Sequence, residues 1–174
     1  YDLLELSGTI PNPKSYKVNA LEDVLSVIMA QNFQEIEKYW NSMSLVEYAT
    51  PDNRLGKSVN GLYALKHPQY GIVYIGKGKP IFNRIKSHYY ATKGKEKAPA
   101  WKQFFEYVTD DITVYWFEVD NTDPIIGEQT REVLERLLQI KYKPLFETLY
   151  RKGMRKELPD IDQAVKEVFT GKYT

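Results

Sequence analysis

The sequence lacks cysteine and has little histidine. None of its 174 residues is cysteine, which excludes disulfide scaffolds, catalysis by a thiol and zinc sites built on cysteine. Its 2 histidines, His67 and His88, are too few for a histidine-rich metal centre. The longest apolar run, at 24–30, is far shorter than the roughly 20 residues that a membrane-spanning helix needs. We therefore expect no membrane partner.

The N-terminal segment shows no signal pattern, and its first residue, Tyr1, is consistent with a trimmed N-terminus. A cytoplasmic location is the resulting expectation. Hydrophobic residues make up 43% of the chain and charged residues 27%, so the chain can bury a core and is not disordered by composition. Its length fits one domain, or one domain with a sizeable extension.

Positive charge is concentrated in one segment, 76–102. This segment holds eight lysine and arginine residues against a single acidic residue, Glu96. Because the whole chain carries +1, a charge of +7 on this segment leaves −6 on the rest. Such asymmetry suggests a surface that faces a polyanion, although a solvated lysine-rich helix and loop would give the same count.

Three regions follow from the pattern of hydrophobic and turn-forming residues. Residues 1–58 are expected to form a helical N-terminal extension with an apolar stripe at 21–40, and Ser44 with Glu47 resembles a capping box that opens a short helix. Residues 59–150 form the expected core. Residues 151–174 are expected to be a tail with a basic patch and a helix that Asp160 caps and Gly171 ends.

The expected core alternates between strands and helices. Short β-branched and aromatic runs at 59–65, 72–75 and 111–119 predict three strands, the first two joined as a hairpin. Helices are predicted from Pro80 to about Thr92, from Pro99 onwards, and from Asp123 to a point before Pro144. The apolar faces of the last two helices are predicted at these positions: Trp101, Phe104, Phe105 and Val108, and then Val133, Leu134, Leu137, Leu138 and Ile140. The order predicts an α+β fold.

Two tyrosines and two residues of the following helix carry the main motif. Gly61–Leu62–Tyr63 and Tyr74–Ile75–Gly76 lie on the paired strands of the predicted hairpin. Arg84 and His88 lie one turn apart on one face of the next helix. This array resembles the GIY-YIG nuclease family, whose name motifs read GLY and YIG here. The resemblance implies a three-stranded antiparallel sheet flanked by helices, and it spans roughly residues 59–147.

The third family element is a glutamate on a later helix. In LERLLQIKYKPLFE, Glu135 takes that position, and Lys143–Pro144 matches the basic residue and proline that follow. Glu147, twelve residues after Glu135, stands where the family usually has asparagine. A second carboxylate there could join the metal, or it could repel the phosphate and weaken activity.

The resemblance implies a metal-dependent DNA endonuclease. One metal ion, Mg²⁺ or Mn²⁺, would bind at Glu135, a hard oxygen ligand suited to it. Arg84 would grip the phosphate, and Tyr63 would act as general base despite an ordinary phenol pKa of roughly 10. His88 could accept the proton of Tyr63 or orient it, and a purely structural role is open. The products would carry a 5′-phosphate and a 3′-hydroxyl.

Secondary contacts complete the expected site. Tyr74, as a member of the motif, and Lys77 are expected near the phosphate or the attacking water. The expected contacts to the nucleic-acid backbone are Lys77, Lys79, Lys86, Lys93, Lys95 and Lys97. DNA is the expected partner and the location would be nucleoid-associated in a bacterium, with RNA as an open alternative. The outer regions could serve target recognition or oligomerisation, and a homo-oligomer is possible. Within the family, a stand-alone chain of this size resembles restriction or phage-type nucleases.

A second function remains open beside the enzyme. The same fold could belong to a non-catalytic protein that binds nucleic acid or to a regulatory protein. Glu147 in place of asparagine is the feature that favours this alternative.

Overall fold

The computed structural model describes residues 15–17, 40–50, 59–95, 98–150 and 160–169. Most of the predicted helix at 21–40, the basic patch at 151–156, Lys97 and Gly171 lie outside these ranges.

The centre of the fold is an antiparallel sheet. Strands β3 (Gly61–His67), β4 (Gly71–Gly78) and β5 (Thr113–Asp120) are the three that the sequence predicted, and β3 lies between the other two. Strand β2 (Asn41–Ser44) adds antiparallel to β5, and β1 (Ser15–Lys17) adds parallel to the same strand. The sheet thus has five strands, so the predicted count of three was wrong. The α+β class and the antiparallel core are confirmed.

Three helices begin at the capping residues that the sequence predicted, Ser44, Asp123 and Asp160. In α7 (Pro124–Tyr142), the Asp123 side chain accepts the backbone N–H of Ile125 at 2.9 Å. In α4 (Leu45–Tyr48), Ser44 accepts from the Glu47 N–H at 3.2 Å. Side-chain oxygens satisfy N–H groups that lack a partner within the helix. The remaining helices are α5 (Ile81–Thr92), α6 (Pro99–Val108), α8 (Leu145–Leu149) and α9 (Ile161–Phe169), the last capped by Asp160.

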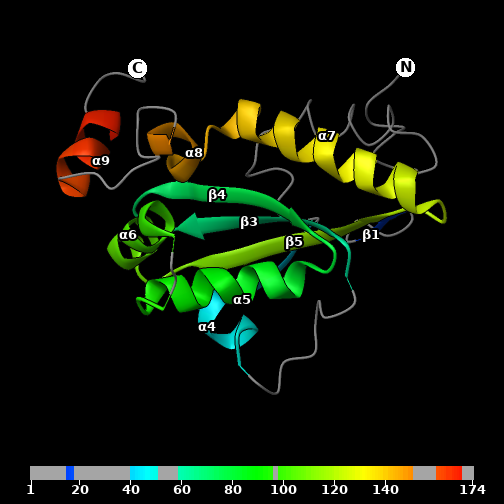
Figure 1. The fold of residues 1–174 in the computed structure, drawn as a ribbon, viewed down its shortest axis with the longest axis horizontal. Coiled ribbons are helices and arrows are strands. Elements are labelled where there is room, and N and C mark those ends of the chain that lie inside the picture. The colour runs from blue at the N-terminus through cyan, green and yellow to red at the C-terminus, as the bar shows by residue number, and fades with distance from the viewer. Residues whose placement is uncertain (1–14, 18–39, 51–58, 96–97, 151–159, 170–174) are drawn as a thin grey trace.

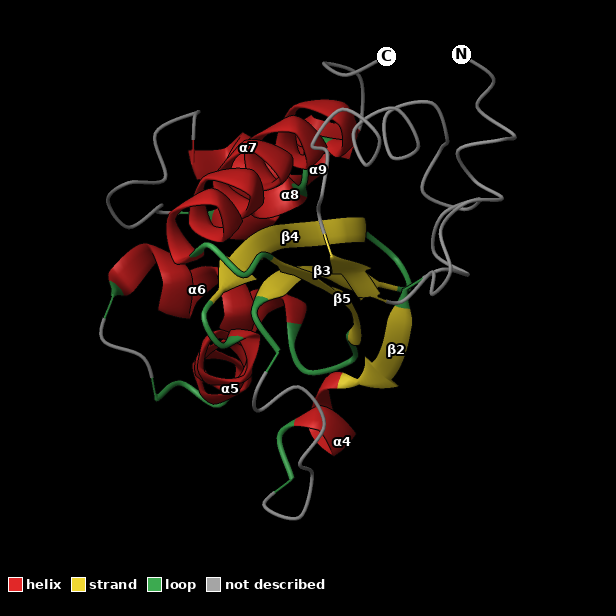
Figure 2. Cartoon of the chain, turned by 90° about the vertical axis from the view of Figure 1, so that its right-hand side faces the viewer, coloured by secondary structure: helices red, strands yellow, loops and turns green. Residues whose placement is uncertain are grey.

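The sheet lies between helices on its two faces (Figures 1 and 2). Because side chains alternate along a strand, neighbouring residues of β3 enter different cores. Tyr63 and Leu65 pack with α5 and α6, whereas Leu62 and Ala64 pack with Leu134 of α7. Tyr63 therefore faces α5, on the opposite side of the sheet from α7.

The apolar face of α7 differs in part from the prediction. Leu134 and Leu138 are buried as expected, but Val133 is 40% exposed and Ile140 is 51% exposed. The helix is rotated so that Gly127, Thr130 and Arg131 are buried instead. This rotation turns Glu135 and Gln139, which are partly buried, toward β4.

Candidate functional site

The hairpin places the ring of Tyr63 over a glycine. Tyr63 on β3 is paired with Gly76 on β4, which is the edge strand of the sheet. A Cβ atom built on Gly76 would lie 2.5 Å from both Cζ and the hydroxyl oxygen of Tyr63. Only a residue without a side chain leaves this space, which is the physical reason for a glycine at position 76.

Tyr74 lies on the same face of the sheet as Tyr63, because it is two residues from Gly76, the residue that pairs with Tyr63. Leu65 pairs with Tyr74 and Lys66 pairs with Ile72, so Val73 is an extra residue on β4. The rings of Tyr63 and Tyr74 are stacked, with their centroids 6.0 Å apart and 16° between their planes. Both phenols thus face α5.

Helix α5 supplies the imidazole and the guanidinium. His88 Nε2 lies 2.8 Å from the Tyr63 hydroxyl oxygen, and His88 is completely buried. Arg84, one turn earlier, has its Cζ 5.5 Å from the centre of the Trp101 ring. Its guanidinium acts on both Tyr63 and Tyr74, through its charge and through hydrogen bonding.

Burial keeps the phenol and the imidazole neutral. Desolvation raises the pKa of Tyr63 well above its ordinary value of 10.0, and the charge and hydrogen bond of Arg84 oppose that rise. Desolvation and the nearby Arg84 charge lower the pKa of His88 well below 6.5. At neutral pH, the pair is therefore an uncharged phenol beside an uncharged imidazole.

Glu135 reaches this group from the other face of the sheet, around the edge strand. Its carboxylate accepts a hydrogen bond from the Lys77 backbone N–H. One turn later, Gln139 Nε2 donates to the Ile75 carbonyl oxygen at 3.2 Å. These two side chains of α7 satisfy backbone groups of β4 that no further strand pairs with, and they fix Glu135 beside Gly76.

The carboxylate is electrostatically coupled to the other predicted residues. Burial raises the pKa of Glu135, and the charge of nearby Glu147 raises it further, whereas Lys77 and Arg84 lower it. The negative charge of Glu135 in turn raises the pKa of both Tyr63 and Tyr74. The structure therefore brings the five predicted residues together as one cluster, the candidate site: Tyr63, Tyr74, Arg84, His88 and Glu135.

Glu147 lies at the border of the candidate site. It accepts a hydrogen bond from Arg136 at 3.0 Å, and 26% of its side chain is exposed. Its charge raises the pKa of Glu135 and of Tyr74, so it stands close to both.

The donor chemistry fits a hard divalent cation. Among the residues that the structure describes, no group of three or more His, Cys, Asp or Glu side chains could hold a metal ion. Mg²⁺ does not require such a group, because it usually keeps several waters and binds through one or two carboxylates and the phosphates of the substrate. Glu135, with Glu147 beside it, supplies that number of carboxylates.

The lysines that the sequence predicted to contact nucleic acid differ in their exposure and in their partners. Lys79 and Lys95 are exposed, and Lys77 is half-buried. The Lys86 ammonium lies 5.1 Å from the centre of the Phe82 ring. Lys93 is already paired, with its Nζ 2.6 Å from Asp110 Oδ2. Of the described members of this set, Lys79 and Lys95 are the most available to an external phosphate.

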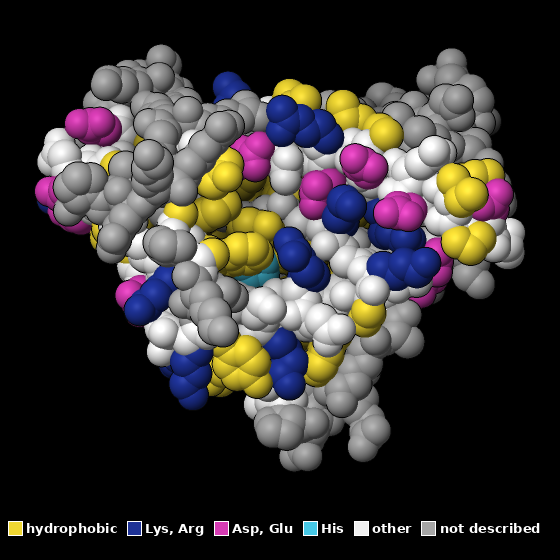
Figure 3. Space-filling view, in the orientation of Figure 1, with side chains coloured by type: hydrophobic (Ala, Val, Ile, Leu, Met, Phe, Trp, Pro, Cys, Tyr) yellow, Lys and Arg dark blue, Asp and Glu magenta, His cyan; other side chains and the backbone are white. Residues whose placement is uncertain are grey.

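The face of the molecule that carries the β4 edge is hollowed (Figure 3). A histidine lies at the floor of the hollow, bordered by hydrophobic side chains and a basic one, and acidic and basic side chains are interspersed to one side of it. Tyr63 itself is 0% exposed. A ligand could therefore reach the Tyr63 hydroxyl only after a covering side chain moves.

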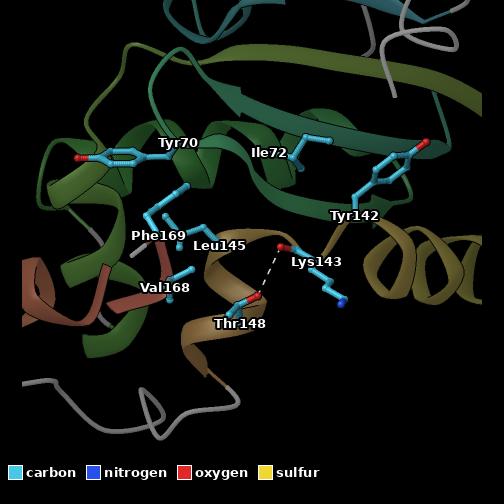
Figure 4. A pocket seen from close by; sticks show the side chains of 8 residues that line it. All are labelled: Tyr70, Ile72, Tyr142, Lys143, Leu145, Thr148, Val168 and Phe169. Atoms are coloured by element: carbon cyan, nitrogen blue, oxygen red, sulfur yellow. Dashed lines mark hydrogen bonds between the residues drawn. The ribbon is translucent and has the colours of Figure 1, made fainter. Parts of the chain in front are cut away.

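A separate pocket of about 370 Å³ lies near the start of β4 (Figure 4). The pocket lies between that strand, the end of α7, α8 and α9. Its lining residues are Tyr70, Ile72, Tyr142, Lys143, Leu145, Thr148, Val168 and Phe169. No member of the candidate site is in that lining, and the hydrophobic character of most of it does not suit a phosphate.

Two residues of the candidate site's surroundings were not predicted. Trp101 was expected only to pack inward, but its indole N–H donates to His88 Nδ1 at 3.1 Å. Gln139 had no expected role, and its bond to Ile75 depends on how α7 lies along β4. No local sequence signal distinguishes either contact from ordinary packing or solvent exposure.

Comparisons with known proteins do not identify a family for this chain. No protein-family model matches the chain, and searches of curated proteins and of solved structures found no significant match. Within the described ranges, no helix is both long enough and apolar enough to cross a membrane.

Proposed function

We propose that the protein is a metal-dependent DNA endonuclease of GIY-YIG type that hydrolyses phosphodiester bonds. The observation that carries the proposal is the convergence of a phenol, a guanidinium, an imidazole and a carboxylate from β3, α5 and α7 around one glycine of the edge strand. These groups are the kinds that such hydrolysis requires: a base for water, a cation for the phosphate and an oxygen ligand for a metal ion.

Each residue has a distinct role in this proposal. Arg84 binds the phosphate oxygens through its paired donors, and it is the exposed side chain that an incoming phosphate would draw away from Tyr63. Tyr63, as phenolate, takes a proton from the attacking water, whose oxygen bonds to phosphorus as the bond to the 3′-oxygen breaks. The leaving 3′-oxygen takes a proton from a solvent water and becomes the 3′-hydroxyl. Tyr74 orients the phosphate or the water, and Lys77 holds Glu135 in place through its backbone N–H.

Glu135, and Glu147 if a second carboxylate is needed, would hold the cation. When bound, Mg²⁺ or Mn²⁺ would neutralise charge on the phosphate and favour ionisation of water and of the nearby phenol.

A plasmid assay tests the proposal. Supercoiled DNA should be nicked or cut with Mg²⁺ or Mn²⁺ and stay intact with a chelator. Glu135→Ala and Tyr63→Phe should abolish cleavage, whereas Glu132→Ala and Tyr90→Phe, exposed neighbours on α7 and α5, should retain it. Retained cleavage in Glu135→Ala would contradict the assignment of the metal ligand.

Arg84 offers a second readout in the same assay. Arg84→Ala should lower the cleavage rate on the order of 100-fold or more while DNA binding weakens much less, because its charge matters most in the transition state. Equal losses of rate and affinity would show that Arg84 is an ordinary backbone contact.

The second candidate function is a non-catalytic nucleic-acid-binding protein. The complete burial of Tyr63 and the ion pair between Glu147 and Arg136 favour it. DNA binding without cleavage under any divalent metal would support it, and competition between matched DNA and RNA duplexes would identify the preferred nucleic acid.

A further inference from the structure

His88 is held from both sides by side chains of different hydrogen-bonding character. Its Nε2 lies 2.8 Å from the Tyr63 hydroxyl oxygen, and its Nδ1 lies 3.1 Å from the Trp101 indole nitrogen. The rings of His88 and Trp101 have centroids 4.7 Å apart. Histidine and tryptophan come from α5 and α6, two helices packed on the same face of the sheet.

The two partners together determine where the proton on His88 lies. An indole N–H can only donate, so Nδ1 must be the unprotonated nitrogen that accepts. Burial and the Arg84 charge lower the pKa of His88, so the ring is neutral and carries a single proton. That proton must then be on Nε2. A hydroxyl oxygen can accept as well as donate, so Tyr63 accepts from Nε2–H.

We infer that Trp101 is a positioning residue of the candidate site: its indole N–H holds His88 as the Nε2–H tautomer, which donates to the Tyr63 oxygen. His88 therefore does not take the proton of Tyr63. Of the two roles open at the level of sequence, orienting the phenol is the one that the contacts support.

For the proposed chemistry, the tautomer of His88 determines which way the O–H bond of Tyr63 points. With its oxygen accepting from Nε2–H, the Tyr63 O–H is directed away from His88. Once the covering side chain has moved and Tyr63 ionises, the proton passes to solvent, and the phenolate keeps the His88 Nε2–H donor as a stabilising partner. This consequence, unlike the tautomer, rests on the proposed function.

Imidazole ¹⁵N NMR tests the tautomer without any activity assay. The chain has 2 histidines, so His67→Asn leaves His88 alone in the spectrum and keeps an acceptor for the Gln69 N–H that binds His67 Nδ1. We expect Nδ1 to have the shift of an unprotonated nitrogen and Nε2 that of an N–H, unchanged between pH 6 and 8. We also expect a coupling across the hydrogen bond from Trp101 Nε1 to His88 Nδ1 in the otherwise unaltered chain. A protonated Nδ1, or the absence of this coupling, would overturn the inference.

A pair of variants isolates the indole N–H. Trp101→Phe removes the donor and should give a mixture of tautomers, whereas Phe105→Leu, whose ring centroid lies equally close to that of His88 at 4.7 Å, should keep Nε2–H. An unchanged tautomer in Trp101→Phe would contradict the role of Trp101.

Kinetics then separate this inference from the proposed function. If cleavage occurs, Trp101→Phe should lower kcat about tenfold with DNA affinity unchanged, the effect of one hydrogen bond. The Nε2–H tautomer in a chain that cuts no DNA would support the inference and count against the nuclease. Cleavage by a chain in which His88 Nδ1 is protonated would support the nuclease and contradict the role inferred for Trp101.

Discussion

At the scale of single residues, the candidate site depends on a glycine, Gly76. The Tyr63 ring passes over Gly76, and any Cβ there would come within 2.5 Å of the phenol. The same glycine lies on the edge strand, where Glu135 binds the adjacent Lys77 N–H. Gly76 therefore allows groups from opposite faces of the sheet to approach each other.

Gly76→Ala should displace the Tyr63 hydroxyl from His88. Overpacking of this kind costs about 1–3 kcal/mol in the free energy of unfolding, and cleavage should be lost with the displaced phenol. The measurement is denaturant unfolding of a double-mutant cycle. In a Tyr63→Leu background, no phenol fills the space, so the same substitution should cost much less. An equal cost in both backgrounds would show that the ring does not set the requirement for glycine.

Glu135→Gln should raise the stability of the protein at pH 7 while abolishing cleavage. The raised pKa of Glu135 means that its carboxyl ionises less readily in the folded protein than in the unfolded chain. Its contribution to the free energy of unfolding therefore falls as the pH rises from the ordinary value of 4.5 through the raised pKa. Gln keeps an oxygen for the Lys77 N–H without the charge.

Urea unfolding at several pH values measures this effect. The advantage of Glu135→Gln should be present at pH 7 and disappear below pH 4.5, where the carboxyl is protonated in both states. Glu132→Gln, exposed on the same helix, is the control and should show no such dependence. A variant less stable than the parent at pH 7 would show that the carboxylate is a stabilising ion pair.

At the scale of elements, the helix α7 is aligned with the edge strand by side-chain contacts to its backbone. Glu135 binds the N–H of Lys77 and Gln139 binds the carbonyl of Ile75, so two residues four apart on the helix match two residues two apart on the strand. This register places the carboxylate at the level of Gly76.

Gln139→Leu should loosen that register. Loss of one hydrogen bond costs about 1 kcal/mol in the free energy of unfolding, and the cleavage rate should fall because Glu135 is less well placed. Ile140→Gln, at the 51% exposed neighbouring position, should change neither quantity. Urea unfolding and plasmid cleavage measure the two effects; a cleavage rate unaffected by Gln139→Leu would remove the positioning role of this contact.

The elements that sequence could predict are those with local signals. The tyrosine-bearing hairpin and the helices opened by Ser44, Asp123 and Asp160 are confirmed, because turn residues and caps act within a few positions. Strands β1 and β2 were missed, because they are short and depend on pairing with a distant strand, β5.

The same distinction holds for the candidate site. The motif spacing led to the five residues of the cluster, since each is fixed to an element with a local signal. The bonds made by Trp101 and Gln139 were not foreseen, because they depend on how helices pack against each other and against β4. The core positions predicted for Val133 and Ile140 were wrong for the same reason, because the face that α7 buries depends on its packing against the sheet.

At the scale of the whole molecule, the basic segment 76–102 is the part of the chain that we propose to face a polyanion. It carries +7 in a chain whose total is +1. The structure distributes these charges between internal partners, such as the Asp110 that binds Lys93, and exposed side chains such as Lys79 and Lys95. Only the exposed cations can release counterions from DNA on binding.

Lys95→Ala should therefore reduce the salt dependence of DNA binding more than Lys93→Ala does. Each lost phosphate contact lowers the slope of log affinity against log salt by about 0.9. Lys93, with its Nζ 2.6 Å from Asp110, should contribute much less than one contact. Fluorescence anisotropy of a labelled duplex at several salt concentrations measures both slopes. A larger loss for Lys93 would show that its ion pair opens on binding.

The most direct test of the central claim is single-turnover cleavage of a labelled DNA duplex in Mg²⁺ by the parent protein and by Glu135→Gln. We predict product with a 5′-phosphate from the parent and none from Glu135→Gln, although that variant remains folded and binds the duplex. Equal cleavage by the two proteins, or none by either with any divalent metal, would contradict a phosphodiester-hydrolysing site built around Glu135.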